Sequence, residues 1–129
     1  MDFKPVYFSE KELNNLTPSC SLNDMDERFM KRLDFARTIA GFPFVLNCAF
    51  RSKEWDASRG RKYDNNGIGC SYHSLGRAVD IRCNDSTNRA SIIYSLLNAG
   101  FKSIGLYPTF IHVDDRYRDD TETAIIWFG

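Results

Sequence analysis

Three things are scarce in this sequence: histidine, an excess of charge of either sign, and long apolar runs. Seventeen Lys and Arg residues balance seventeen Asp and Glu residues, so the formal net charge is zero. A balanced chain lacks the basic field that gathers nucleic-acid phosphates, which argues against nucleic-acid binding through bulk charge. No apolar run approaches the roughly 20 residues that cross a bilayer, so insertion into a membrane is not expected.

The N-terminal segment also lacks a recognisable export signal. It reads MDFKPVYFSEKEL, without the basic start and the apolar stretch of a signal peptide. We therefore expect a soluble chain that stays in the cytoplasm of the cell that makes it until it is released.

Cysteine is present, but in no familiar pattern. The four cysteines are Cys20, Cys48, Cys70 and Cys83, and no two of them form a C-x-x-C pair. This argues against a zinc ribbon or a thioredoxin-type redox site, and a disulfide framework needs an oxidising compartment that this N-terminus does not indicate. We expect reduced thiols that fill the core. A thiolate-containing metal site stays open, because Cys70 lies three residues before His73 and Cys83 lies three residues after Asp80.

The residues that are present indicate one folded domain. A chain of 129 residues matches a typical domain of about 100 to 150 residues. Hydrophobic residues make up 43% of it, and ten Phe, six Tyr and two Trp are enough to fill a core, which excludes intrinsic disorder. We expect a single domain over residues 1–129, and a monomer.

Two amphipathic helices are expected. The first covers residues 23–40, where apolar residues recur every three or four positions after an acidic start and before Gly41 and Pro43. The second covers residues 86–99 and ends at Gly100. Its expected apolar face consists of Ala90, Ile93, Leu96 and Leu97.

Shorter helical elements are also predicted. Ser9 precedes Glu12 by three residues, as in a capping box, which predicts a short helix or turn over residues 8–13. A further helical turn is expected over residues 54–59, followed by a polar loop over residues 60–69.

Five strands complete the predicted fold. The run FPFVLNCAF is continuously apolar and of strand length, which predicts an inner strand at residues 42–50. The other strands are expected at residues 77–83, 103–107, 110–114 and 124–128, with a turn at Pro108-Thr109. Helices combined with a small, mainly antiparallel sheet make the predicted class α+β.

The two histidines of the chain each lie near a carboxylate at a spacing that suits a strand. His73 precedes Asp80 by seven residues, with a glycine turn between them, so the loop can fold His73 back over Asp80. His112 and Asp114 are two residues apart on one predicted strand, which points both to the same face. Two imidazoles and a carboxylate are the three protein ligands that a catalytic zinc site needs.

Each of these residues also has a structural alternative. A single histidine in a mixed sheet is usually a hydrogen-bonded structural residue, and an aspartate beside a strand is usually solvated or caps a turn. The physical argument alone leaves both readings open.

Around these residues the sequence resembles a known family. SYHSLGRAVD, at residues 71–80, matches the S-x-H-x-x-G-x-A-x-D signature of the zinc D-alanyl-D-alanine carboxypeptidase and murein endopeptidase family. FIHVD, at residues 110–114, matches the family's second metal-binding strand. The F-S-x-x-E-L opening and the C-A-F-R-S segment are similar as well, so the resemblance covers nearly the whole chain. It implies the family's hedgehog-type, D,D-peptidase-like zinc fold.

The resemblance also implies roles for individual residues. It implies one zinc ion held by His73, Asp80 and His112. Arg51 would clamp a substrate carboxylate or polarise the scissile carbonyl, for which a permanently charged fork of donors is suited; an ordinary surface ion pair is the alternative. Ser71 would hydrogen-bond the substrate or only shape the turn.

The sequence departs from the family at the expected general base. Many members carry an acid three residues before the second histidine, but Thr109 stands there and cannot accept a proton. We expect Asp114 to be the catalytic base instead, as in the H-x-D branch of the family; the alternative is that Asp114 orients the imidazole of His112. Asp115 points the other way on the strand and is disfavoured, and Gly76 is expected to serve the backbone of the turn.

The function that this resemblance implies is zinc-dependent hydrolysis of peptide bonds in peptidoglycan stem peptides or cross-links, as by a D,D-carboxypeptidase or endopeptidase. A catalytically inactive, zinc-containing cell-wall-binding module on the same fold is the alternative, and Thr109 favours it. A disulfide-stapled secreted domain without metal is a third possibility. A short chain of this kind without an export signal is typical of a phage lysis or entry enzyme, an endolysin released from the host cytoplasm or carried by the virion.

Overall fold

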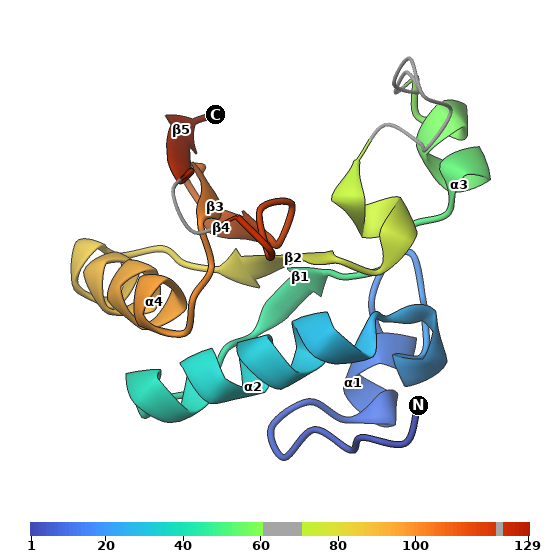
Figure 1. Cartoon of the computed structure of the whole chain (residues 1–129). Helices are drawn as coiled ribbons and strands as arrows, with labels where there is room; N and C mark the ends of the chain where they lie inside the picture. Colours follow the sequence, from blue (N-terminus) through green and yellow to red (C-terminus); the bar gives the residue numbers. More distant parts are fainter. Residues whose placement is uncertain (61–70, 121–122) are drawn as a thin grey trace.

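The computed structural model describes residues 1–60, 71–120 and 123–129, and these residues contain four α-helices and a five-stranded sheet (Figure 1). The helices are α1 (Glu10–Asn14), α2 (Glu27–Ala40), α3 (Lys53–Ser58) and α4 (Ser86–Asn98), with 3-10 turns at Leu22–Asp24 and Tyr72–Leu75. The strands are β1 (Leu46–Cys48), β2 (Ala78–Arg82), β3 (Ser103–Leu106), β4 (Phe110–Asp114) and β5 (Ile125–Phe128). The predicted α+β class is confirmed.

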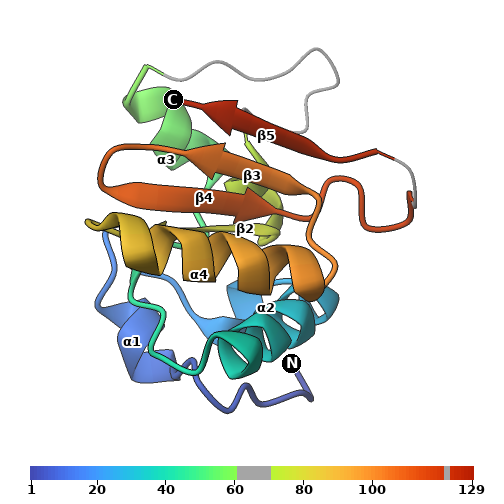
Figure 2. The ribbon, with the colours of Figure 1, turned by 90° about the vertical axis from the view of Figure 1, so that its left-hand side faces the viewer.

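The sheet has the strand order β1-β2-β4-β3-β5. Its neighbouring strands are antiparallel, except for β3 and β5, which are parallel (Figure 2). The pairing register aligns one residue from each of the five strands, so that these residues are partners in one row across the sheet. In strand order, this row consists of Cys48, Asp80, His112, Gly105 and Trp127.

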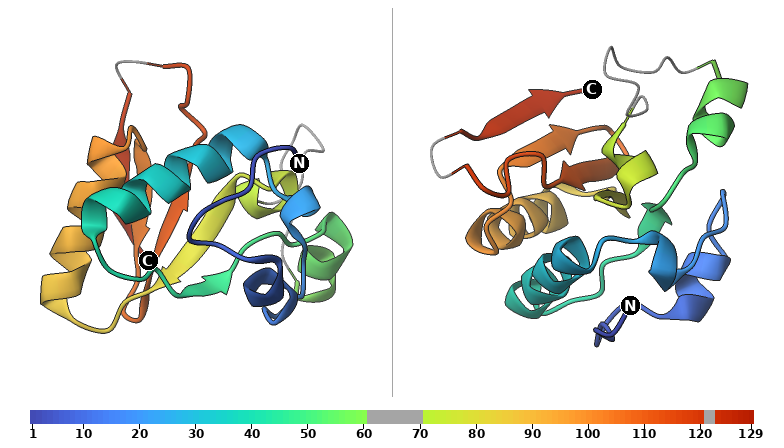
Figure 3. Two further views of the ribbon diagram at one scale, coloured as in Figure 1. Left: turned by 90° about the horizontal axis from the view of Figure 1, so that it is seen from below. Right: turned by 45° about the vertical axis from the view of Figure 1, so that its right-hand side comes forward.

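The hydrophobic core lies between one face of this sheet and helices α2 and α4, which pack side by side (Figures 2 and 3). Val79, Ile81, Ile111 and Val113 belong to it and have no exposed surface. Because successive side chains of a strand point to opposite faces, the residues between them, in the row across the sheet, face away from the helices. The register thus separates an apolar face from a face that carries the polar residues.

Helix α2 begins later than the sequence indicated. A 3-10 turn occupies Leu22–Asp24, and the Asp26 side chain then accepts a hydrogen bond from the Phe29 backbone N–H at 2.9 Å, which caps the helix. Of the acidic residues at the start of residues 23–40, Asp24 therefore belongs to the turn and Asp26 to the cap, and Glu27 is the first residue of the helix. The helix end is as predicted, because Gly41 adopts a left-handed conformation directly after Ala40.

The prediction for residues 42–50 is wrong in two respects. Only Leu46–Cys48 forms a strand, and this strand pairs with β2 alone, so β1 is an edge strand and not an inner one. Pro43 has no N–H to donate to a neighbouring strand, and the side chain of Val45 is about half exposed. The remaining apolar residues are buried outside the sheet, as at Phe44 and Ala49. Apolarity predicted their burial but not the element that carries them.

The buried face of α4 is only partly the expected one. Leu96 is buried and Ile93 packs against the core, as predicted, whereas Ala90 and Leu97 are exposed and Ile92 and Ser95 are buried instead. The buried face of α4 can include Ser95 because the Ser95 hydroxyl donates a hydrogen bond to the Ile92 carbonyl oxygen at 2.9 Å and so does not need a water molecule as its partner.

The other expected elements agree with the structure within a few residues. Ser9 caps α1 by accepting from the Glu12 N–H, and α3 occupies the place of the expected helical turn over residues 54–59. Of the expected loop over residues 60–69, only residue 60 is described; residues 61–69 and Cys70 lie outside the described residues.

Cys20, Cys48 and Cys83 are buried free thiols, as predicted. Among the described residues, no helix is both long and apolar enough to cross a membrane.

Candidate metal centre

His73 is held in place by the turn that connects the segment after α3 to strand β2. It lies in the 3-10 turn Tyr72–Leu75, which Gly76 ends in a left-handed conformation, and its side chain is 1% exposed. Its Nδ1 lies 2.6 Å from the Ala49 carbonyl oxygen, and its own carbonyl accepts from the Arg51 N–H at 3.3 Å. These contacts fix the ring beside the end of β1 and direct its other nitrogen, Nε2, toward Asp80 at 3.3 Å.

Asp80 and His112 face each other across strands β2 and β4. The Nδ1 atom of His112 lies 3.1 Å from Asp80 Oδ1, the same oxygen that His73 Nε2 approaches, and the two imidazole rings are 5.2 Å apart, edge to face. Burial alone would raise the pKa of Asp80, but the two histidines beside it hold this pKa well below its ordinary value. The structure thus brings together His73, Asp80 and His112, which the sequence singled out as metal ligands.

Asp114 lies behind His112, on the side away from Asp80. Its carboxylate has no exposed surface. One oxygen, Oδ2, accepts from His112 Nε2 at 2.8 Å and from an Arg116 Nη at 2.7 Å, and Oδ1 accepts from the Nε and backbone N–H of Arg116. Burial would raise the pKa of Asp114, but these donors lower it, and burial would lower the pKa of His112, but Asp114 and Asp80 raise it. Asp114 therefore orients His112 and carries a negative charge.

The hydrogen bonds of the two rings indicate where their protons lie. A carbonyl oxygen can only accept, so His73 donates through Nδ1 to Ala49. Burial lowers the pKa of His73, which favours the neutral ring with a lone pair on Nε2. Asp114 and Asp80 raise the pKa of His112, which favours the protonated ring that donates to both carboxylates. A metal ion bound at Asp80 would take the place of the Nδ1 proton of His112, while Nε2 still donates to Asp114.

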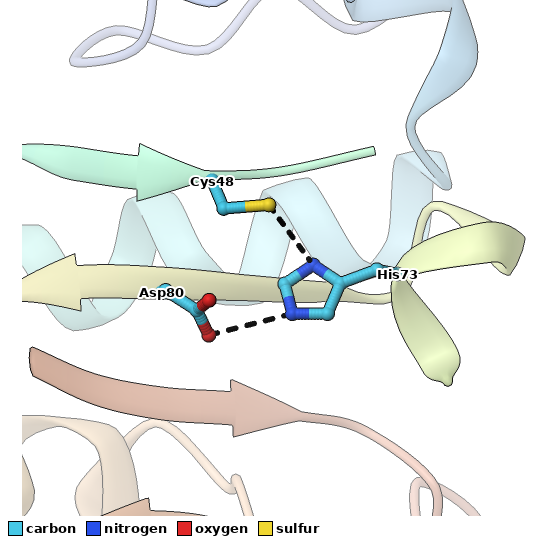
Figure 4. Close-up of side chains that lie close together, drawn as sticks. All are labelled: Cys48, His73 and Asp80. Atoms are coloured by element: carbon cyan, nitrogen blue, oxygen red, sulfur yellow. Dashed lines mark hydrogen bonds and ion pairs between the residues drawn. The ribbon is translucent and has the colours of Figure 1, made fainter. Parts of the chain in front are cut away.

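Cys48 is a further potential ligand that sequence reasoning assigned only to the core. It is buried, and it forms with His73 and Asp80 a group whose donor atoms all lie within 4.8 Å of one another, so this group could hold a metal ion. Cys48 and Asp80 contact opposite nitrogens of the His73 ring (Figure 4). The Sγ atom lies 3.9 Å from Nδ1, which already donates to Ala49, and burial raises the pKa of Cys48 to about 11. Of the two cysteines that the sequence offered as metal ligands, Cys83 donates to the Asp85 carbonyl oxygen at 3.4 Å and is not in this group, and Cys70 lies outside the described residues.

Arg51 follows β1 and reaches the same neighbourhood. Its Nε lies 3.1 Å from Asp56 Oδ1, one Nη donates to Ser71 Oγ at 3.2 Å, and the other lies 3.8 Å from Cys48 Sγ. The side chain is 11% exposed. Arg51 is therefore not an ordinary surface ion pair, and Ser71 is bonded to it two residues before His73.

An aromatic residue, Trp127, lies beside His112 on the side of the sheet away from β2. No feature of the sequence indicated this contact. The ring of Trp127, on β5, lies 5.5 Å from the His112 ring, and it leans over Gly105 on the intervening strand. The guanidinium of Arg116 lies over both Trp127 and Tyr72, at 5.3 and 5.1 Å from the ring centroids. Only the pairing of β5 with β3 brings Trp127 to this place, and sequence spacing does not reveal such a pairing.

Three other expectations concern residues around the centre. Thr109 is exposed in the turn before β4. Asp115 lies in a separate ion-pair network with Arg77 and Arg118, as expected for a residue that points away from Asp114. Gly76 has a φ of +69° and approaches the backbone at Asp24 so closely that a Cβ would lie 2.3 Å from its carbonyl oxygen. The expectation that Gly76 serves the backbone is thus confirmed.

Comparison with known proteins adds no assignment, since no model of a protein family and no curated protein matches the chain. The geometry of the site therefore carries the functional argument.

Proposed function

We propose that the chain is a zinc-dependent peptidase that hydrolyses peptide bonds in peptidoglycan stem peptides or cross-links, as a D,D-carboxypeptidase or endopeptidase. The observation that supports this most is the convergence of His73 Nε2 and His112 Nδ1 on one oxygen of Asp80. Two imidazole nitrogens and a carboxylate are a donor set that zinc prefers. A bound zinc ion would replace the proton between His112 and Asp80, because metal ligands bind in their deprotonated form.

The remaining residues fit this function in distinct ways. The bond from His73 Nδ1 to Ala49 and the bond from His112 Nε2 to Asp114 each fix a ring, as partners of metal-bound histidines commonly do. A zinc ion at this place would polarise the scissile carbonyl and make water a nucleophile near neutral pH. Arg51, held beside the centre, would bind a substrate carboxylate or stabilise the negative charge that develops on the carbonyl oxygen.

The contacts of Asp114 favour its orienting role over the role of general base. Both of its oxygens accept bonds from His112 or Arg116, and it has no exposed surface. Neither Thr109 nor Asp114 then offers a free carboxylate for proton transfer. This observation favours a second candidate function, a zinc-containing cell-wall-binding module that has no catalytic activity.

Digestion of purified peptidoglycan separates the two candidates. The protein is incubated with wall fragments, with and without a chelator, and the products are identified by mass spectrometry. Chelator-sensitive release of peptides or D-alanine by the native chain, absent from His112→Ala, supports the peptidase. Zinc retention and wall binding without any released product would support the binding module, and undiminished cleavage by His112→Ala would end both proposals.

A cobalt substitution separates the two possible ligand sets. His73 and Asp80 are common to both sets, which differ in His112 and Cys48. We expect Co²⁺ to bind without the near-ultraviolet band of a thiolate ligand, and Cys48→Ala to retain the metal while His112→Ala loses it. The reverse pattern would assign the metal to Cys48, His73 and Asp80.

A further inference from the structure

Asp56 is a fully buried carboxylate that the proposed chemistry does not use. It lies on α3, eight residues after Cys48, and its exposed surface is 0%. An aspartate without access to water needs a compensating positive group, because burial strongly disfavours an unpaired charge. The guanidinium of Arg51 supplies it, with 3.1 Å between Arg51 Nε and Asp56 Oδ1.

The local sequence brings the two residues of this ion pair close together. Ser52, which directly follows Arg51, caps α3 by accepting from the Trp55 N–H at 3.0 Å, and the helix begins at Lys53. One turn later, Asp56 lies on the side of the helix that faces back toward Arg51, and its own N–H bonds to the Ser52 carbonyl. The helix thus presents a carboxylate to the arginine that precedes it.

The nitrogens of the Arg51 guanidinium have different neighbours. Nε faces Asp56, and Ser71 Oγ bridges the pair, at 3.2 Å from an Arg51 Nη and 3.5 Å from Asp56 Oδ2. The Nη that does not bond Ser71 lies 3.8 Å from Cys48 Sγ, on the side of the candidate metal centre. Because Ser71 lies two residues before His73, this arrangement ties the direction of the guanidinium to the turn that carries the metal ligand.

We propose that Asp56 is a positioning residue, which fixes the guanidinium of Arg51 beside the turn that carries His73, so that a terminal nitrogen of Arg51 can bind the carboxylate of the substrate. This inference rests on the proposed function, because it takes Arg51 to be the substrate-binding arginine. It adds the residue that sets the direction of the guanidinium, and a comparison of a peptide acid with the matching peptide amide measures its effect.

The test measures binding of two peptides to the zinc-loaded protein by calorimetry, a D-alanyl-D-alanine peptide acid and its C-terminal amide. The native chain should bind the acid about 10- to 100-fold more tightly than the amide, the range expected for a bond to a charged group. Arg51→Ala and Asp56→Asn should both abolish most of this preference. Asp115→Asn is the matched control, since Asp115 is 3% exposed and pairs with Arg77 Nε at 2.7 Å, and it should keep the preference.

The outcomes distinguish failure of the role of Asp56 from failure of the proposed substrate-binding role of Arg51. Loss of the preference in Arg51→Ala but not in Asp56→Asn would overturn the role of Asp56 and leave that of Arg51 intact. An unchanged preference in both variants would overturn carboxylate binding by Arg51, and loss in Asp115→Asn as well would show a general structural effect and overturn the inference. If Asp56→Asn does not fold, NMR of the native side chain decides: separate signals for the two Arg51 Nη groups support a held guanidinium, and one averaged signal overturns it.

Discussion

Replacement of Gly76 by alanine tests how the turn that carries His73 is attached to the helical layer. At this position φ is +69°, and a Cβ would lie 2.3 Å from the Asp24 carbonyl oxygen and 2.9 Å from Met25 Cα. The Gly76 carbonyl also accepts from the Asp26 N–H at 2.9 Å. Alanine therefore meets two penalties, an unfavourable backbone conformation and an overlap with a backbone that cannot move freely.

Gly41 offers a control that carries only one of these penalties. Its φ is +75°, but a Cβ there would have no neighbour within 4 Å. The left-handed conformation costs an L-residue roughly 1–2 kcal/mol, and forced overlap in a packed region adds about 1–3 kcal/mol. We expect Gly41→Ala to lower the free energy of unfolding by about 1–2 kcal/mol and Gly76→Ala by about 2–5 kcal/mol.

Urea denaturation of the native chain and of both variants measures the difference. With a slope of about 2 kcal/mol per molar urea, an extra 2 kcal/mol or so lowers the midpoint of Gly76→Ala by about 1 M relative to Gly41→Ala. Equal midpoints for the two variants would refute the reasoning, because they would mean that the turn does not approach Asp24 as closely as described.

Three further predictions concern the candidate metal centre and its surroundings. Zinc at about 100 times its dissociation constant should stabilise the native chain by about 2.7 kcal/mol, which raises the melting temperature by about 10 °C for a domain of this size; a shift that persists in His112→Ala would contradict it. Asp114→Asn should weaken zinc binding about 10- to 100-fold, measured by competition with a chromophoric chelator, whereas unchanged affinity with lost turnover would restore Asp114 as the base. Gly105→Ala should displace the ring of Trp127, because a Cβ would lie 2.7 Å from it. A change in tryptophan fluorescence reports this displacement, and an unaltered spectrum would contradict it.

Local rules predicted each His–Asp pair separately. His112 and Asp114 share a strand face through their spacing of two, and the glycine between His73 and Asp80 permits the turn that brings them together. These relations span at most seven residues. The approach of His112 to Asp80 instead depends on the pairing of β2 with β4, and only the resemblance to the peptidase family implied that the three residues form one site.

The parts that the sequence missed depend on contacts between distant elements. Trp127 reaches His112 only because β5 adds to the sheet beside β3. The buried carboxylate of Asp56 is indistinguishable in sequence from a solvated helical aspartate. The apolar character of residues 42–50 predicted that they are buried, but not that only three of them form a strand, since an apolar segment can be buried by helices and by strands alike.

The row of residues across the sheet also has a consequence for folding. Because side chains alternate, a slip of β4 by one residue against β2 would turn His112 into the core and Ile111 or Val113 outward. Such a slip would bury an imidazole among apolar side chains and leave Asp80 without a partner from β4. The ligands therefore meet only after the strands have reached their final alignment, and an ion captured there would favour that alignment over every shifted one.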